Sequence, residues 1–341
     1  MQPAANQNPR VPWVDFIRAL AMFLVILAHV EVRGDGPEWV ILLYYSITRV
    51  GVPLFFMLSG YLLLQKEESL LVFLKKRAWK VFLPFFVWSL VYMAWHGDFE
   101  GKSFSFQIIA RVLIQILRGP REAHLWFFYY LFGLYLLTPI LRVFVVRASS
   151  RDLVYFIALS FVAGPVVSLL KEFTPIRVGI DLQFFTGYIG YYLLGYYLGR
   201  MELLPKRLIP SAIIVYILML FFTVYPCLLS KDYREYFTGY LSVNVVPMTA
   251  AAFVLLKSIG VNLPESGYRY LTPVSRASFG IYLIHIILMV ELSAHLFRQV
   301  TFLQVGSSIY VMPLVALVSF GLCLLVVCLL QMIPVLKYIV P

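Results

Sequence analysis

Apolar runs of about 20 residues follow one another through almost the whole of this chain. We place ten of them, at about 12–31, 41–64, 79–95, 124–144, 153–170, 184–200, 208–226, 240–257, 277–297 and 308–333. A helix of about 20 residues spans the roughly 30 Å of hydrocarbon in a bilayer. The chain is 61% hydrophobic and only 13% charged, with a mean hydropathy of +0.85, which excludes a soluble globular protein. The sequence therefore predicts an all-α integral membrane protein, a bundle of about ten transmembrane helices.

The same pattern predicts a simple domain organisation. Residues 1–11 form a polar N-terminal tail, and residues 12–341 contain no polar stretch long enough for a second, soluble domain. We expect 12–341 to be a single membrane-embedded domain. The first apolar run carries Asp15 and Arg18, and no small-residue cleavage site follows it, so we do not interpret it as a cleaved signal peptide.

The net charge of +11 raises the question of nucleic-acid binding. The Lys and Arg residues lie in short loops between the apolar runs, however, and not on one face of a folded domain, so we predict no nucleic-acid partner. With the N-terminus inside, the inner loops and tails carry 16 of these residues and the outer loops carry 10. The positive-inside rule then favours both termini in the cytoplasm.

Two ionisable residues of the first run, Arg18 and His29, are the most informative for function. Ionisable residues at membrane depth are costly to bury and suggest a functional site. Arg18 and His29 are eleven residues apart, which in a helix places them within about 20° of one face and roughly 16 Å apart along the axis. We therefore expect both to point into one cavity, one near each side of the bilayer. The alternative for Arg18 is structural, because Asp15 at i−3 neutralises it.

Further polar residues are predicted at the same two depths. The outer level combines His29, Arg49, His124 and Glu291, and the inner level combines Arg18 with Ser59 and the basic residues of 75–80. Structural alternatives exist for several of them. Arg49 could pair with Glu291 or extend to the interface, His124 and Trp126 could belong to an interfacial aromatic belt, and His285 fits a hydrogen-bonded core histidine.

The connection 103–120 has apolar residues at helical spacing, with Arg111, Gln115 and Arg118 on the opposite face. This pattern predicts an amphipathic helix that lies in the membrane interface. The three cysteines, Cys227, Cys323 and Cys328, have no spacing typical of a metal site, and we predict no metal.

The catalytic motifs that are present in the sequence, and those that are missing from it, indicate the candidate chemistry. The chain contains no Gly-rich phosphate loop and no GxSxG nucleophile turn. A histidine with cationic groups nearby suits proton transfer during acyl or phosphoryl transfer, because its pKa lies near neutral pH.

The chain resembles the acyltransferase 3 family of membrane acyltransferases, which modify bacterial surface glycans. The resemblance rests on four runs in order: Arg18-x10-His29 preceded by Asp15, RVGVPLFFMLSGYLL at 49–63, HLWFF at 124–128 and SFGIYLIH at 278–285. It implies ten helices, acetyl-CoA as a donor from the cytoplasm, a glycan hydroxyl as acceptor, and essential roles for Arg18 and His29. It also implies that the basic motif before the third run is matched by Arg77 and Lys80.

Together these observations predict an O-acetyltransferase of the bacterial cytoplasmic (inner) membrane that acts on a cell-surface or lipid-linked glycan. We expect Lys76, Arg77 and Lys80 to bind the phosphates of acetyl-CoA, with Arg18 and Ser59 along the donor site, and His29 to act as general base or to accept the acetyl group. The residues expected to bind or orient the acceptor are Arg49, His124, Trp126, His285 and Glu291. The alternatives are transfer of another acyl group such as succinyl, or a transporter of lipid-linked glycan. The expected partners are the lipid bilayer, the glycan acceptor and proteins of polysaccharide assembly.

Overall fold

The computed structural model describes residues 11–30, 36–101, 105–201, 205, 207–295, 297–300, 303 and 307–341, without the side chain of residue 298. The predicted tail therefore lies outside the described residues, apart from Val11. Four of the loop cations that enter the inside–outside comparison, Arg10, Arg33, Lys102 and Lys206, also lie outside them, as does the side chain of Arg298.

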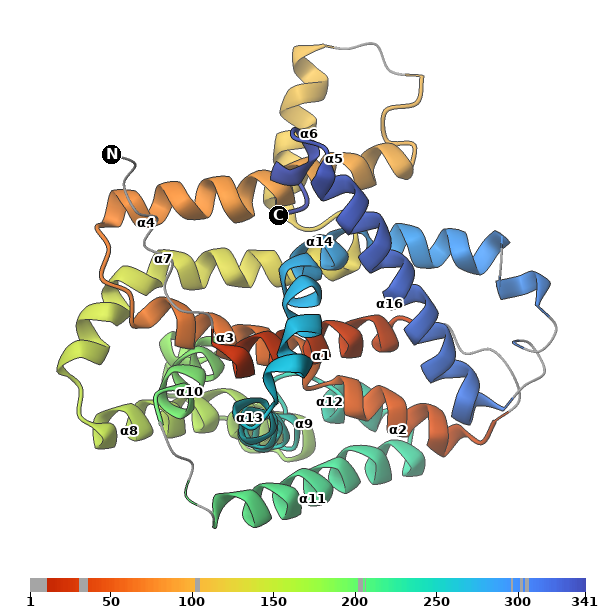
Figure 1. Cartoon of the computed structure of the whole chain (residues 1–341). Coiled ribbons are helices and arrows are strands. Elements are labelled where there is room, and N and C mark those ends of the chain that lie inside the picture. The colour runs from red at the N-terminus through yellow and green to blue at the C-terminus, as the bar shows by residue number, and fades with distance from the viewer. Residues whose placement is uncertain are drawn as a thin grey trace.

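The described chain is helical, and Figure 1 shows its helices gathered into one bundle. In the first half these are α1 (Pro12–Ala28), α2 (Glu38–Thr48), α3 (Gly51–Leu64), α4 (Leu70–Arg77), the π-helical turn η1 (Ala78–Phe82), α5 (Leu83–Trp95), α6 (Phe106–Arg118), the 3₁₀ turn η2 (Ala123–Leu125) and α7 (Trp126–Arg147). The second half contains α8 (Ser150–Phe161), the π-helical turn η3 (Val162–Val166), α9 (Val167–Phe173), η4 (Gln183–Phe185), α10 (Ile189–Gly199), α11 (Leu208–Leu229), α12 (Tyr233–Phe237), α13 (Val245–Val261), α14 (Glu265–His295), η5 (Phe297–Gln299), α16 (Ser308–Met332) and η6 (Leu336–Tyr338).

Seven helical segments within the described residues are long and apolar enough to cross a bilayer. They are Glu38–Leu64, Leu70–Trp95, Ala123–Arg147, Ser150–Phe173, Leu208–Leu229, Glu265–His295 and Ser308–Met332, and each coincides with a predicted run. The protein is therefore an all-helical membrane protein. The other three predicted runs contain the shorter helices α1, α10 and α13, of 17, 11 and 17 residues. A total of ten spans and the side on which the termini lie remain predictions.

The second apolar run is not the continuous helix that its hydropathy predicts. A turn at Arg49 and Val50 separates α2 from α3. Pro53 has no N–H to donate, so the carbonyl of Arg49 loses its helical partner at this point. Arg49 and Val50 themselves keep right-handed helical backbone angles.

Helix α1 lies at the centre of the bundle, and α2, α3, α13, α14 and α16 pack around it. Eleven of its residues are buried, Asp15 among them. Because α1 is enclosed, the polar side chains that it carries must find partners on neighbouring helices.

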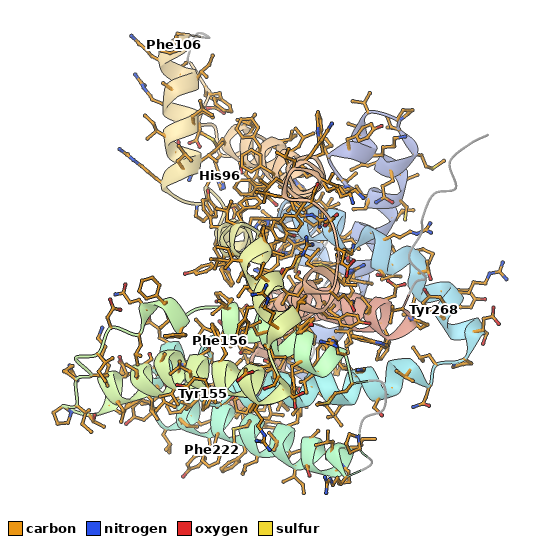
Figure 2. The ribbon with its side chains drawn as sticks, turned by 90° about the vertical axis from the view of Figure 1, so that its left-hand side faces the viewer. His96, Phe106, Tyr155, Phe156, Phe222 and Tyr268 are labelled. Carbon is orange, nitrogen blue, oxygen red and sulfur yellow. The ribbon has the colours of Figure 1, made fainter. Side chains whose placement is uncertain are left out.

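Helix α6 is the amphipathic helix predicted from its spacing. Ser105 caps its N-terminus by accepting the N–H of Ile108, and the helix ends at Gly119. It stands out from the bundle beside α5 in both views (Figures 1 and 2), and Phe106 at its start is strongly exposed. Its position at the membrane interface remains a prediction.

The closest helix packing is that of α3 against α10, and it depends on glycine. A Cβ on Gly60 would collide with the backbone of Tyr192, and one on Gly195 would collide with the backbone of Met57. A Cβ on Gly199 would meet the ring of Tyr61. Small residues allow helix backbones to approach closely in lipid, so these glycines set the distance between α3 and α10.

We expect Gly195→Ala to destabilise the protein, because the added methyl group must push α10 away from α3. Overpacking of this kind typically costs about 1–3 kcal/mol. The matched control is Gly133→Ala in α7, where the new Cβ meets nothing within 4 Å. Thermal unfolding of the detergent-purified protein measures the difference, and equal midpoints for the two variants would contradict this account of the α3–α10 contact.

Candidate active site

Arg18 and Asp15 of α1 are held by hydroxyl groups of α14. Ser275 donates its Oγ–H to Asp15 Oδ1 at 2.5 Å, and the hydroxyl of Tyr268 donates to Oδ2 at 3.0 Å. Arg18 Nη1 donates to Ser275 Oγ at 3.2 Å and lies 3.8 Å from Asp15 Oδ1. The carboxylate thus orders both residues, while the Arg18 side chain keeps 30% of its surface exposed and reaches a cavity.

This cavity has a volume of about 720 Å³ and is rich in cations; we call it the basic cavity. The cationic residues that line it are Arg18, Lys66, Arg77, Lys80, Arg276 and Lys337, together with Ser59 and the aromatic rings of Trp79 and Tyr338. None of its described lining residues is acidic. An excess of unbalanced positive charge of this kind favours an anionic ligand.

Lys66 shows the effect of this charge. Burial lowers the pKa of Lys66, and the positive charges of Arg77, Lys76 and Lys80 lower it further, against a smaller opposing effect of Glu68. The ammonium group therefore lies where positive charge is in surplus.

The π-helical turn η1 places Arg77 and Lys80 along the basic cavity. It ends just before Pro84, whose missing N–H leaves the carbonyl of Lys80 without its usual helical donor. The wider turn absorbs this defect, as π-turns inside helices often do at functional sites. The Arg77 guanidinium lies 5.6 and 5.8 Å from the ring centroids of Phe73 and Tyr135, so its side chain is positioned by two aromatic faces.

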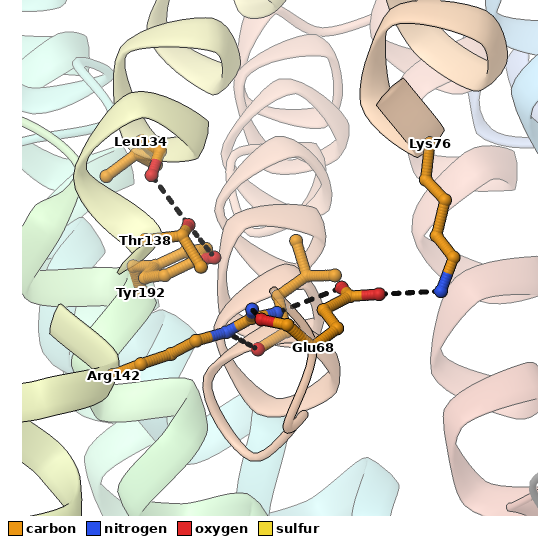
Figure 3. Close-up of polar contacts among 7 residues, drawn as sticks. Glu68, Lys76, Leu134, Thr138, Arg142 and Tyr192 are labelled. Carbon is orange, nitrogen blue, oxygen red and sulfur yellow. Dashed lines mark hydrogen bonds and ion pairs between the residues drawn. The ribbon is translucent and has the colours of Figure 1, made fainter. Parts of the chain in front are cut away.

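Lys76 does not line the basic cavity, although the sequence groups it with Arg77 and Lys80. Its Nζ donates to Glu68 Oε2 at 2.7 Å, and Arg142 Nη2 donates to the other carboxylate oxygen at 3.1 Å (Figure 3). Arg142 also donates to the carbonyl of Leu63 at 3.0 Å. The carboxylate of Glu68 therefore binds Lys76 outside the cavity that Arg77 and Lys80 line. A phosphate contact by Lys76 stays a prediction.

The second cluster of the site consists of three histidines that lie in a row. The ring of His285 on α14 is 5.0 Å from that of His29 on α1 and 4.9 Å from that of His124 on η2, centroid to centroid. His124 and His285 are buried. Among the described residues these rings do not form a metal-ligand group.

Hydrogen bonds define the tautomers of two of these rings. The Nδ1–H of His29 donates to the carbonyl of Val25, and that of His285 donates to the carbonyl of Tyr282, both at 2.7 Å. Nε2 of each ring therefore carries the lone pair. Nε2 of His285 and both ring nitrogens of His124 have no hydrogen-bond partner within the described part of the chain. Unpaired buried nitrogens cost free energy, which is typical of groups retained for function.

Arg18 and His29 share a face of α1 but not a cavity. Both side chains contact α14, through Ser275 and His285, which confirms the prediction of a common face. His29 lines a separate cavity of about 200 Å³ between α14 and α16. The prediction of one shared cavity is wrong, because Arg18 lines the basic cavity and His29 lines the other. Tyr282 lines the basic cavity, and its ring contacts His285 of the histidine row.

The other residues predicted near the acceptor are held by contacts of their own. The Arg49 guanidinium stacks on the rings of Tyr45 and Tyr240, at 3.8 and 5.0 Å from their centroids. Trp126 stacks on Tyr240 as well, and the centroids of these two rings lie 5.5 Å apart.

Glu291 is half-exposed and lies 3.4 Å from Nε2 of His295. It does not form the predicted alternative pair with Arg49. The structure therefore brings together His29, His124 and His285, links Arg49 and Trp126 through one tyrosine, and leaves Glu291 at the surface.

Several residues of the basic cavity were not predicted from the sequence, namely Lys66, Trp79, Arg276, Tyr282, Lys337 and Tyr338. Tyr282 lies inside the run 278–285, one helical turn before His285, so its place in that run was an available signal. Lys337 reaches the basic cavity because the chain after α16 folds back. No local sequence pattern predicts this reversal.

The fold and this site define a membrane protein with a cation-lined cavity next to a row of three histidines, an arrangement suited to group transfer. A family model for an acyltransferase domain matches residues 11–332. The chain therefore belongs to the acyltransferase 3 family of membrane acyltransferases. No match was found among curated proteins or among solved structures.

The Glu68 cluster yields a pH-dependent prediction. Burial raises the pKa of Glu68, but its hydrogen bonds and charge interactions with Lys76 and Arg142 outweigh burial, and the net pKa is below 4.5. Its contribution to stability is therefore present above about pH 4.5 and is lost as the pH falls through the lower, folded-state pKa.

We expect Glu68→Gln to lower the unfolding midpoint at pH 7 and to flatten its decline between about pH 5 and 3. The control is Glu67→Gln, an exposed neighbour. Midpoints measured across this range would refute the assignment if the Glu68 and Glu67 variants followed the same curve.

Proposed function

We propose that this protein is an acyl-CoA-dependent O-acetyltransferase that transfers acetyl to a hydroxyl group of a cell-surface or lipid-linked glycan. The observation that carries the proposal is the basic cavity, which begins among cations and ends at Tyr282, directly beside the histidine row. A polyanionic carrier with a long neutral arm, such as acetyl-CoA, matches that order of charge.

The donor would bind with its phosphates among the cations of the cavity. Arg77 and Lys80 would contact the nucleotide phosphates, supported by Lys66, Arg276 and Lys337, which lie along the same cavity. Arg18, held by Ser275, would bind the pyrophosphate or the start of the pantetheine arm, and Ser59 would lie along that arm. Trp79 and Tyr338 offer aromatic faces for the adenine.

His29 has the tautomer that a general base requires. Because its Nδ1–H is engaged by Val25, Nε2 is free to take the proton of the acceptor hydroxyl as the oxygen attacks the thioester carbon. The C–S bond then breaks, and the thiolate of CoA leaves and is protonated. In the second route Nε2 attacks the thioester first, and the acetyl group passes from His29 to the hydroxyl. In both routes the thioester carbon would have to pass the edge of the Tyr282 ring to reach His29.

The acceptor would approach the histidine row from the side opposite the basic cavity, where His29 borders its own small cavity. His124 and His285 would orient His29 or the hydroxyl, and the aromatic group around Arg49 and Trp126 suits the apolar face of a sugar ring. The motif runs resemble those of the O-acetyltransferase of enterobacterial common antigen. On that resemblance we propose a lipid-linked glycan as acceptor, the bacterial inner membrane as location, and polysaccharide-assembly proteins as partners.

The first test is His29→Ala. We expect a loss of acetyl transfer of about 10²–10⁴-fold, which is the usual contribution of a positioned acid–base group, with the protein still folded. The control is His295→Ala, since His295 is exposed and outside the row. The readout is incorporation of labelled acetyl from acetyl-CoA into glycan, in membrane vesicles with and without the protein. Near-normal turnover by the His29 variant would overturn the proposed mechanism.

Donor binding has its own test in the basic cluster. We expect Arg77→Ala and Lys80→Ala to raise the KM for acetyl-CoA more than they lower kcat, because phosphates far from the thioester are bound equally in ground state and transition state.

The matched control for these variants is Lys76→Ala, which removes an adjacent cation that is engaged by Glu68 outside the cavity. It should leave the KM nearly unchanged. A KM that responds to Lys76 but not to Arg77 or Lys80 would contradict the proposed donor site.

A further inference from the structure

Tyr282 occupies the boundary between the basic cavity and the histidine row. It lines the basic cavity, and its ring centroid lies 5.6 Å from that of His285 and 5.5 Å from that of His124. Its hydroxyl donates to the backbone carbonyl of His124 at 2.5 Å. The ring is 5% exposed and packs against Phe127 and Phe128. Tyr282 is therefore held firmly as the wall at this end of the cavity.

The lining of the basic cavity changes character toward this wall. Ser275, which binds Arg18, precedes Tyr282 on α14 by seven residues, or about 10 Å of helix. The lining also includes the apolar side chains of Phe55, Phe127, Leu131 and Phe279, of which Phe127 contacts the Tyr282 ring. Ser278, four residues before Tyr282, adds one hydroxyl, which donates to the carbonyl of Ser275. The cations all belong to the remaining part of the lining, so the end of the cavity that the histidines border offers bulk and apolar surface.

We propose that Tyr282 determines which acyl group this enzyme transfers, and that it restricts the donor to a short, uncharged acyl chain. The inference rests on the proposed function, in which CoA phosphates bind at the cationic end and the acyl group enters deepest. A chain longer than acetyl would collide with the Tyr282 ring. A terminal carboxylate, as in succinyl, would be buried against aromatic rings without a cation beside it, which is strongly unfavourable.

The structure also provides a matched control residue. Tyr92 of α5 is fully buried, its ring centroid lies 5.1 Å from that of His124, and its hydroxyl donates to the carbonyl of Leu283 on α14 at 2.8 Å. Like Tyr282, Tyr92 has its ring against that of His124 and a hydroxyl that donates to a backbone carbonyl, which here belongs to α14 instead of η2. It does not line the basic cavity, so its removal loosens the histidine row without opening the acyl end.

The experiment compares acyl donors in inside-out membrane vesicles that contain the full-length protein and their own glycans. The donors are acetyl-, butyryl-, hexanoyl- and succinyl-CoA, and the readout is kcat/KM for labelled acyl incorporation, expressed relative to acetyl-CoA for each variant. Wild type should prefer acetyl. Tyr282→Ala should raise the butyryl and hexanoyl ratios about tenfold or more, the range that pocket size commonly controls, while succinyl should stay poor.

Two further variants keep the result decisive. Tyr282→Phe retains the ring and should retain the acetyl preference, even if loss of the hydroxyl slows transfer. Tyr92→Ala should lower the rates for all four donors by a similar factor. If Tyr282→Ala does not fold, the smaller change Phe127→Leu at the same wall should still raise the butyryl ratio.

The outcomes separate this inference from the proposed function. Unchanged donor ratios in a Tyr282→Ala protein that still uses acetyl-CoA would overturn the role of Tyr282 alone, and so would a Tyr92→Ala variant with the same shift in ratios. A wild-type protein that uses none of the four donors would instead overturn the proposed function.

Discussion

The contact between α1 and α14 is the constraint on which the site depends. Helix α1 packs against five helices, so the charged groups on its buried face must be matched from within the bundle. Helix α14 matches Asp15 and Arg18 through Ser275 and Tyr268, and it places the ring of His285 edge-on against that of His29. These two contacts fix the rotation and the register of one helix against the other. The apolar surface between them, which by itself would tolerate sliding, is thereby held in one arrangement.

Much of the fold follows from the sequence because the bilayer simplifies the problem. Backbone groups in hydrocarbon must be bonded within the helix, so apolar length alone locates most of the segments, and amphipathic spacing locates α6. The hydrogen-bonding defects introduced by proline are harder to predict. Pro53 interrupts a run with uniform hydropathy, and Pro84 is accommodated by a π-turn instead of a break. Which response occurs depends on what the neighbouring helices support, and that information is not local.

The sequence predicts many of the residues of the candidate site, but it does not predict the shape of the cavities that they line. Helical periodicity was enough to place Arg18 and His29 on one face, since periodicity concerns a single helix. Whether two side chains on that face share a cavity depends on the volume contributed by other helices, and here Arg18 and His29 line different cavities. The same limit applies to Lys76, whose direction is decided by competition for Glu68, a residue that precedes it by eight positions across a turn.

The end of the chain has a consequence for how the protein can be handled. After α16 the chain turns back, and Trp88 and Gln331 donate side-chain hydrogen bonds, each of 2.9 Å, to the carbonyls of Ile339 and Val340. Val340 is fully buried, and Pro341 lies in the lining of the basic cavity. Anything fused to Pro341 therefore starts at the rim of that cavity. A bulky affinity tag or fluorescent protein placed there would compete with an incoming ligand for the opening, and a long, flexible spacer would be needed to keep the entrance clear.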